Sequence, residues 1–203
     1  MSGKITVIRH APTEYNKKNI FMGTLDIPII NFDEVQISDT KELVQKENFT
    51  AIYSSPLKRA LQTAIKVVGS KEDIIIDARL IERNLGVWQG EQKEDIQNRY
   101  SNAFNNGVMD FYFTPNNGEN FQSMISRIAD FICTIYKDNC NVLVFTHNGV
   151  FRVIKSLLTG ATLSKVFSIK EPFLIPQSFI LDNSLYNKIK ANPFYTIDNY
   201  MNN

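Results

Sequence analysis

Cysteine and histidine are scarce in this chain of 203 residues, which contains two of each. Cys133 and Cys140 are too few for a disulfide framework, and their spacing matches no metal-binding motif. We therefore expect free thiols, with Cys133 packed on a helix face as a small hydrophobic side chain. This use of cysteine is typical of a cytoplasmic protein.

Long apolar runs and a large net charge are also missing. No run approaches the roughly 20 apolar residues that span a bilayer, and the first ten residues lack the apolar core of a secretory signal. The net charge is +1, so no global field attracts nucleic acid or an anionic membrane. We expect neither as a partner. Any binding of anions must depend on local geometry.

Apolar runs alternate with helical patterns along the chain. Strands are expected in a run that ends at Arg9 and His10, and at Ala51–Ser54, Ile74–Ile76, Val142–Thr146 and Ser178–Leu181. Helices are expected at Asp39–Lys46, after a Ser55 cap up to Gly69, and at Lys93–Phe104, Glu119–Tyr136 and Gly149–Leu158. This alternation predicts an α/β domain over residues 1–203, with a mostly parallel sheet covered on both faces. An aromatic insertion at about 104–121 and a polar tail at about 182–203 are the exceptions.

The two histidines each follow a predicted strand, where ligands bind in open α/β sheets. His10 follows Arg9, and His147 follows the run VLVFT, while Arg59 lies at a helix start and Glu82 in a loop. A neutral imidazole can form a covalent intermediate, and guanidinium groups can clamp phosphoryl oxygens. A carboxylic acid can protonate the departing oxygen. Each residue alone has an ordinary structural explanation, but the set together is suited to phosphoryl transfer.

Four segments resemble the histidine phosphatase superfamily, also called phosphoglycerate mutase-like. The family pattern Arg-His-Gly-x-Thr-x-x-Asn is matched by Arg9, His10, Ala11, Thr13 and Asn16. Tyr53 to Ala64 match the Tyr-Ser-Ser-Pro-Leu-x-Arg segment, and the acid loop is matched by Leu80, Glu82, Gly86, Trp88 and Gly90. The late Thr-His-Gly-Gly-Val-x-Arg pattern corresponds to Thr146, His147, Asn148, Gly149, Val150 and Arg152.

The resemblance implies a three-layer α/β/α sandwich and a phosphomonoester hydrolase that needs no metal or organic cofactor, like the histidine acid phosphatases. It implies that His10 is the phosphorylated nucleophile and Glu82 the general acid and later base. It also implies that the phosphoryl group is held by Arg9, Arg59, Asn16 and His147. Further candidates for contact with a small phosphorylated metabolite are Asn148, Gly23 and Arg83.

Some of these residues have competing structural interpretations. Thr13 and Asn16 are common in turns, and Arg152 is expected to support its helix or a nearby carboxylate. Ala11 and Asn148 stand where the family has glycine. Glycine would allow positive φ, which alanine adopts poorly, so Ala11 could narrow the pocket floor.

Three functions remain open at this point. A phosphatase is favoured over a mutase because residues 100–126 contain no Lys or Arg to hold a doubly anionic substrate. Phe111, Tyr112 and Phe113 could form a lid or simply pack on the domain. Arg83, which follows Glu82 as in the mutases, could hold a second anionic group or be an exposed loop residue. A weakly active relative that only binds phosphorylated ligands is the third possibility, and Ala11 is its main support.

Overall fold

A central sheet of five strands organises the chain, as the alternating pattern predicts. The structure is a computed structural model that describes residues 2–30, 34–105, 108–110, 112–137 and 139–197. The strand order is β3-β2-β6-β1-β7, and only β7 runs antiparallel to its neighbour. The strands are β1 (Ser2–Arg9), β2 (Ala51–Ser54), β3 (Ile74–Ile76), β6 (Asn141–Thr146) and β7 (Gln177–Asp182).

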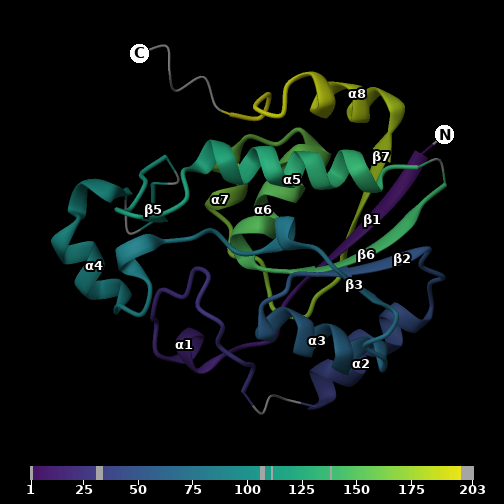
Figure 1. The fold of residues 1–203 in the computed structure, drawn as a ribbon, viewed down its shortest axis with the longest axis horizontal. Helices are drawn as coiled ribbons and strands as arrows, with labels where there is room; N and C mark the ends of the chain where they lie inside the picture. Colours follow the sequence, from purple (N-terminus) through teal and green to yellow (C-terminus); the bar gives the residue numbers. More distant parts are fainter. Residues whose placement is uncertain (1, 31–33, 106–107, 111, 138, 198–203) are drawn as a thin grey trace.

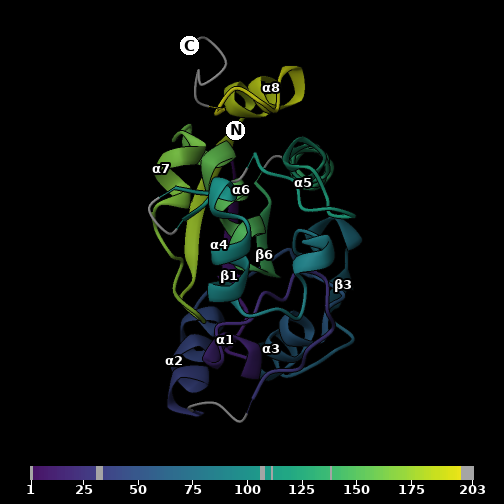
Figure 2. The ribbon, with the colours of Figure 1, turned by 90° about the vertical axis from the view of Figure 1, so that its left-hand side faces the viewer.

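Helices cover both faces of this sheet (Figures 1 and 2). On one face lie α5 (Phe121–Ile135), α6 (Asn148–Thr159), α7 (Leu163–Phe167) and α8 (Asn183–Ala191), and on the other lie α2 (Glu34–Gln45) and α3 (Lys58–Val68). The central strands are buried on both sides: Val142 and Val144 pack with α5 and α6, whereas Leu143 and Phe145 pack with α2 and α3. The side chains alternate because successive residues of a strand point to opposite faces. The expected three-layer α/β/α fold is confirmed.

The sheet edge where β1 and β6 end is covered by smaller elements. These are α1 (Glu14–Lys17), α4 (Lys93–Arg99) and the short antiparallel pair β4 (Phe104–Asn105) and β5 (Val108–Met109). Figure 1 shows α1, α4 and β5 on the side of the sheet away from the N-terminus. Short 3₁₀ turns occur at Ala78–Leu80, Gly86–Trp88 and Ser101–Ala103.

Several element boundaries differ from those expected. The helix expected from Asp39 begins at Glu34, and the one expected to reach Phe104 stops at Arg99 before a 3₁₀ turn. Leu57 rather than Ser55 is the N-cap residue of α3. Ser55 Oγ accepts a hydrogen bond from the Leu57 amide (3.3 Å), and it also forms a hydrogen bond with His147.

The tail from residue 182 contains a helix that its polar composition did not indicate. The Asp182 carboxylate accepts a hydrogen bond from the Leu185 amide (2.8 Å) and so caps α8. Ile189 is buried, and Tyr186 stacks on Tyr136 of the segment after α5, with ring centroids 4.8 Å apart. Residues 198–203 of this tail lie outside the described part of the chain. Within the described residues, no helix is long and apolar enough to cross a membrane.

Candidate active site

The two histidines meet because β1 and β6 are parallel neighbours. Arg9 pairs with Thr146 in the register, and the His10 amide donates to the Thr146 carbonyl (2.9 Å). The next residue on each strand is therefore a histidine, and the two ring centroids lie 5.2 Å apart. The imidazole pair expected from the sequence is present at the carboxyl edge of the sheet.

The ring of His10 is held in one tautomer by its own backbone. Nδ1 lies 2.6 Å from the carbonyl oxygen of Ala11, and because a carbonyl oxygen only accepts hydrogen bonds, Nδ1 carries the proton. The lone pair is then on Nε2. Burial, and next the charges of Arg59 and Arg9, lower the pKa of His10 well below its ordinary value. His10 is consequently a neutral imidazole with a nucleophilic nitrogen at neutral pH.

Arg59 is fixed by three hydrogen bonds from its guanidinium group. Nη1 donates to the Leu25 carbonyl and Nη2 to the Gly23 carbonyl, both at 2.7 Å, and Nε donates to His147 Nδ1 at 3.1 Å. Gly23 has a φ of 50°, a region that glycine adopts without strain. Burial lowers the pKa of Arg59 to about 10, so it stays cationic at neutral pH. These contacts use three of its five N–H groups, and the others remain for an anion.

His147 supports Arg59 from a fully buried position. Because an arginine only donates, Nδ1 of His147 accepts, and its Nε2 lies 2.7 Å from Ser55 Oγ. Burial, followed by the charge of Arg59, lowers the pKa of His147 well below its ordinary value. In this arrangement His147 is neutral and acts on the site through its hydrogen bond with Arg59.

Arg9 has a buried donor with no acceptor in the described protein. Its Nη1 donates to the Glu171 carbonyl (2.6 Å) and its guanidinium lies 3.7 Å from the Phe173 ring centroid, but Nε is buried without a hydrogen-bond partner. Burial lowers the pKa of Arg9 to about 10, with the charge still present at neutral pH. A buried unpaired donor is costly unless a ligand supplies the acceptor, so Nε indicates an anion-binding position.

The Glu82 carboxylate is held by two backbone amides. Oε1 accepts from the Arg83 amide and Oε2 from the Gly149 amide, both at 3.0 Å. A Cβ atom on Gly149 would lie 2.5 Å from Glu82 Oε1 and 3.2 Å from Met124 Cε. A methyl group at residue 149 would therefore displace the Glu82 carboxylate, which is the end of a flexible side chain. This effect was not predicted from the sequence.

A cavity of about 290 Å³ joins these groups. It is lined by all the predicted site residues except His147, namely Arg9, His10, Asn16, Gly23, Arg59, Glu82, Arg83 and Asn148. Asn16 also belongs to the capping box of α1, since its Oδ1 accepts from the amide of the N-cap residue Thr13 at 3.0 Å. Its contact with a phosphoryl group stays a prediction. Arg152 lines the cavity too, and it supports the Ile169 carbonyl through Nε at 2.8 Å.

One of the two alternatives for Arg83 is wrong. Arg83 is not an exposed loop arginine: it is 6% exposed, and its Nε donates to the Glu119 carbonyl and its Nη2 to the Phe113 carbonyl. Burial lowers its pKa to about 10. Ala11 needs no positive φ, because the described non-glycine residues with positive φ are Asn19, Asn117, Asn139 and Leu174, and Ala11 is not among the residues that line the cavity. The Ala11 methyl packs in the core beside α3, and its amide donates to Thr63 Oγ1 (2.9 Å).

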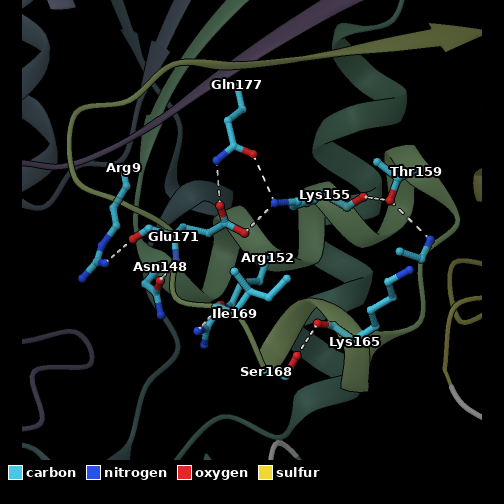
Figure 3. A network of polar contacts seen from close by, with 11 residues as sticks. Arg9, Asn148, Arg152, Lys155, Thr159, Lys165, Ser168, Ile169, Glu171 and Gln177 are labelled. Carbon is cyan, nitrogen blue, oxygen red and sulfur yellow. Dashed lines mark hydrogen bonds and ion pairs between the residues drawn. The ribbon is translucent and has the colours of Figure 1, made fainter.

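The segment of residues 168–174 makes hydrogen bonds to residues that line the cavity (Figure 3). Its role was not identified from the sequence. The Glu171 carbonyl binds Arg9, and its amide donates to Asn148 Oδ1 (3.3 Å). Its carboxylate is 1% exposed and binds Lys155 Nζ (2.9 Å) and Gln177 Nε2 (2.8 Å). Glu171 thus anchors this segment from behind the cavity.

Comparisons with known proteins agree with this geometry. The profile of the histidine phosphatase superfamily (branch 1) matches residues 5–172. Phosphoserine phosphatase 1 of Hydrogenobacter thermophilus is 29% identical over 190 residues, covering 92% of this chain and 85% of that protein. A 2,3-bisphosphoglycerate-dependent phosphoglycerate mutase of Bifidobacterium longum is 24% identical over 217 residues, covering 91% and 88%.

The solved structures show the same fold. YhfR of Bacillus stearothermophilus superposes with a TM-score of 0.79 at 24% identity, covering 89% of this chain and 92% of that one. The fold expected from the sequence is therefore found in proteins of low sequence identity.

Proposed function

Because the chain belongs to the histidine phosphatase superfamily (branch 1), we propose that it hydrolyses phosphate monoesters through a phosphohistidine formed on His10. The observation that carries this proposal is the neutral His10 ring, whose Nε2 lone pair is fixed beside two buried guanidinium groups. Arg9 has a buried N–H group without an acceptor, which a phosphoryl oxygen would supply.

In the first step, Nε2 of His10 attacks the phosphorus atom and the bond from phosphorus to the ester oxygen breaks. Glu82 in its acid form gives its proton to the departing oxygen, so a neutral alcohol leaves. In the second step, the Glu82 carboxylate takes a proton from water, and the resulting oxygen nucleophile attacks the phosphorus. The bond between phosphorus and Nε2 then breaks, which restores His10 and releases inorganic phosphate.

The arginines stabilise negative charge on the transferring group. Arg9 lies at the end of β1 and Arg59 at the start of α3. The hydrogen bonds from Arg9 Nη1 and Arg59 Nε go to a backbone carbonyl and a histidine and not to a carboxylate, so the positive charge of both side chains stays available to an anion. Because two guanidinium groups can supply the positive charge that stabilises the transferring phosphoryl group, we propose that the reaction needs no metal. His147 orients Arg59 through Nδ1, and direct contact of His147 with the phosphoryl group stays a prediction.

Hydrolysis is favoured over mutase transfer by the outer part of the cavity. The cavity-lining residues from the insertion are Phe104, Val108 and Met109, none of which binds a second phosphate. Arg83 is held by loop carbonyls, which favours a structural role for this arginine. The relative from Hydrogenobacter thermophilus is named a phosphatase, which supports the same choice.

Turnover of p-nitrophenyl phosphate and of a sugar-phosphate panel, beside a His10→Ala variant, tests the proposal. We expect loss of at least about a thousandfold in kcat for the variant, because the nucleophile is removed. A rapid acid-free quench with ³²P-labelled substrate should give an alkali-stable, acid-labile phosphoprotein in the wild type only. EDTA should leave the rate unchanged. Equal turnover by the variant would contradict the proposal, and isomerisation of a phosphoglycerate would favour the mutase.

A further inference from the structure

We propose that the natural substrate carries its phosphate on an apolar body about the size of an aromatic ring, which binds in the outer half of the cavity. This inference rests on the proposed phosphatase activity and specifies the leaving group. The observation behind it is a group of four apolar side chains, Phe21, Leu85, Phe104 and Met109, that line the same cavity as the reacting groups and pack in one cluster with Trp88. We call these four residues the wall of the cavity.

Apolar side chains from several separate segments form the wall. Phe21 follows α1, Leu85 precedes a 3₁₀ turn, and Phe104 and Met109 face one another in the register of β4 and β5. Further apolar residues of the lining come from helices, Phe121 and Met124 from α5 and Phe167 from α7. Segments far apart in the sequence therefore supply hydrophobic and aromatic side chains to one cavity, as in many ligand sites.

Aromatic packing behind the wall keeps it in place. Trp88 is 1% exposed, and Phe104 stacks on it at 5.6 Å between centroids with an angle of 19°. Phe21 lies 5.7 Å from Trp88, and Phe113 stacks on Trp88 at 5.3 Å. Of the expected lid aromatics, Phe113 therefore packs on the domain, and Phe111 lies outside the described residues. The wall is preorganised, so a ligand would not have to order it.

The main competitor is a small, charged leaving group such as an amino acid. Lys93 lies at the cavity with its Nζ 5.7 Å from the Phe21 ring centroid, and Arg152 lines the same space. A carboxylate could reach these cations. A compact zwitterion, however, would place its polar groups against phenylalanine and methionine side chains that offer no strong hydrogen bond, and it would leave most of the wall uncovered.

Three alkyl phosphates with alcohols of comparable basicity separate these alternatives: benzyl phosphate, O-phospho-L-serine and glycerol 1-phosphate. We expect kcat/KM for benzyl phosphate to exceed that for each of the others by roughly ten- to a hundredfold, the usual value of burying a ring. Phe104→Ala should reduce this preference to a few fold. Met109→Ala, at a half-buried position, provides a second variant if Phe104→Ala does not fold.

The control is Val87→Ala, because Val87 lies in the same loop region but its side chain points to solvent and is 47% exposed. This variant should keep the preference of the wild type. Faster turnover of O-phospho-L-serine, abolished by Lys93→Met, would overturn the proposal, as would an equal effect of Phe104→Ala on all three substrates. If the phosphatase activity itself is wrong, p-nitrophenyl phosphate will not be hydrolysed either, so the two failures are distinguishable.

Discussion

Two residues without ionisable groups determine where the ionisable ones point. The Ala11 carbonyl fixes the tautomer of His10, and Gly149 provides both an amide and the space for the Glu82 carboxylate. Neither role can be inferred from the residue type, since alanine and glycine carry no side-chain group that indicates a site. Their effect depends on a backbone atom and on a missing Cβ atom.

Gly149→Ala should therefore impair proton donation by Glu82, although Glu82 itself is unchanged. The added methyl would lie 2.5 Å from Glu82 Oε1, so the carboxylate must move away from the leaving oxygen. For alkyl phosphates, whose alcohols need a proton, we expect kcat/KM to fall by roughly ten- to a hundredfold. For p-nitrophenyl phosphate, whose phenolate leaves unaided, the fall should be only a few fold.

Glu82→Gln should show the same dependence on the leaving group, since it removes the transferable proton, and the glutamine NH2 would also face one of the two backbone N–H groups that bind the carboxylate. Thr159→Ala, at the other end of α6, is the matched control and should leave both substrates unaffected. An equal loss on good and poor leaving groups in Gly149→Ala would show that the methyl disturbs binding of the phosphoryl group rather than proton transfer.

At the level of elements, the segment 168–174 is a support for the cation side of the cavity. Phe173 lies under Arg9, the Leu174 amide donates to the Arg9 carbonyl at 3.0 Å, and the Glu171 carbonyl binds the Arg9 guanidinium. The buried Glu171 carboxylate keeps this segment on α6 through Lys155. Arg9 is thus positioned from two sides.

Glu171→Gln should weaken binding of inorganic phosphate by roughly three- to tenfold, because Arg9 loses part of its fixed geometry. It should also lower the free energy of unfolding by about 1–3 kcal/mol, since the variant leaves Lys155 without its anion. Adding Lys155→Met should restore part of that free energy. Inhibition constants for phosphate and urea unfolding give the two readouts, and unchanged phosphate inhibition would contradict the positioning role.

The elements that were predicted well are those whose own residues form an apolar run or stripe with a recognisable end. The strands at Ala51–Ser54, which is partly buried, and Asn141–Thr146, which is mostly buried, are short apolar runs. Helix α6 ends at Gly160 in the left-handed conformation, as glycine after an apolar stripe indicates. The ends of β1 and β6 also placed His10 and His147 correctly beside one another. By contrast, α8 has few apolar residues and depends on packing against α5, so its pattern resembled a polar tail.

The site itself was predictable where side chains carry the chemistry and not where the backbone does. Arg9, His10, Arg59 and Glu82 were identified from residue type and the family pattern, and the cavity contains all four. The buried position of Arg83 depends on carbonyls of residues thirty or more positions away, which no local pattern encodes. The neutral state of His147 likewise depends on Arg59 and Ser55, brought together only by the fold.

For the whole molecule, this site places buried cations and two neutral histidines at one edge of the sheet, and this arrangement affects folding stability. Folding removes His10 and His147 from water beside Arg59, so both resist protonation in the folded state. The unfolded chain has no such restriction, and its histidines have pKa values of about 6.5. The two states therefore bind different numbers of protons below that pH.

This difference predicts how stability depends on pH. Above about pH 6.5 the histidines are neutral in both states and contribute nothing to the pH dependence. As the pH falls below that value, the unfolded chain takes up protons that the folded chain refuses, so the free energy of unfolding decreases. Each histidine adds a slope of about 1.4 kcal/mol per pH unit.

Urea unfolding of the wild type and His10→Gln between pH 7 and pH 5 measures this effect. Carboxylates titrate equally in both proteins, so the difference in slope isolates one histidine. The variant should lose about 1.4 kcal/mol less per pH unit near pH 5 than the wild type does. Parallel slopes would mean that His10 takes up a proton in the folded state, and a charged ring at that position could not serve as the nucleophile.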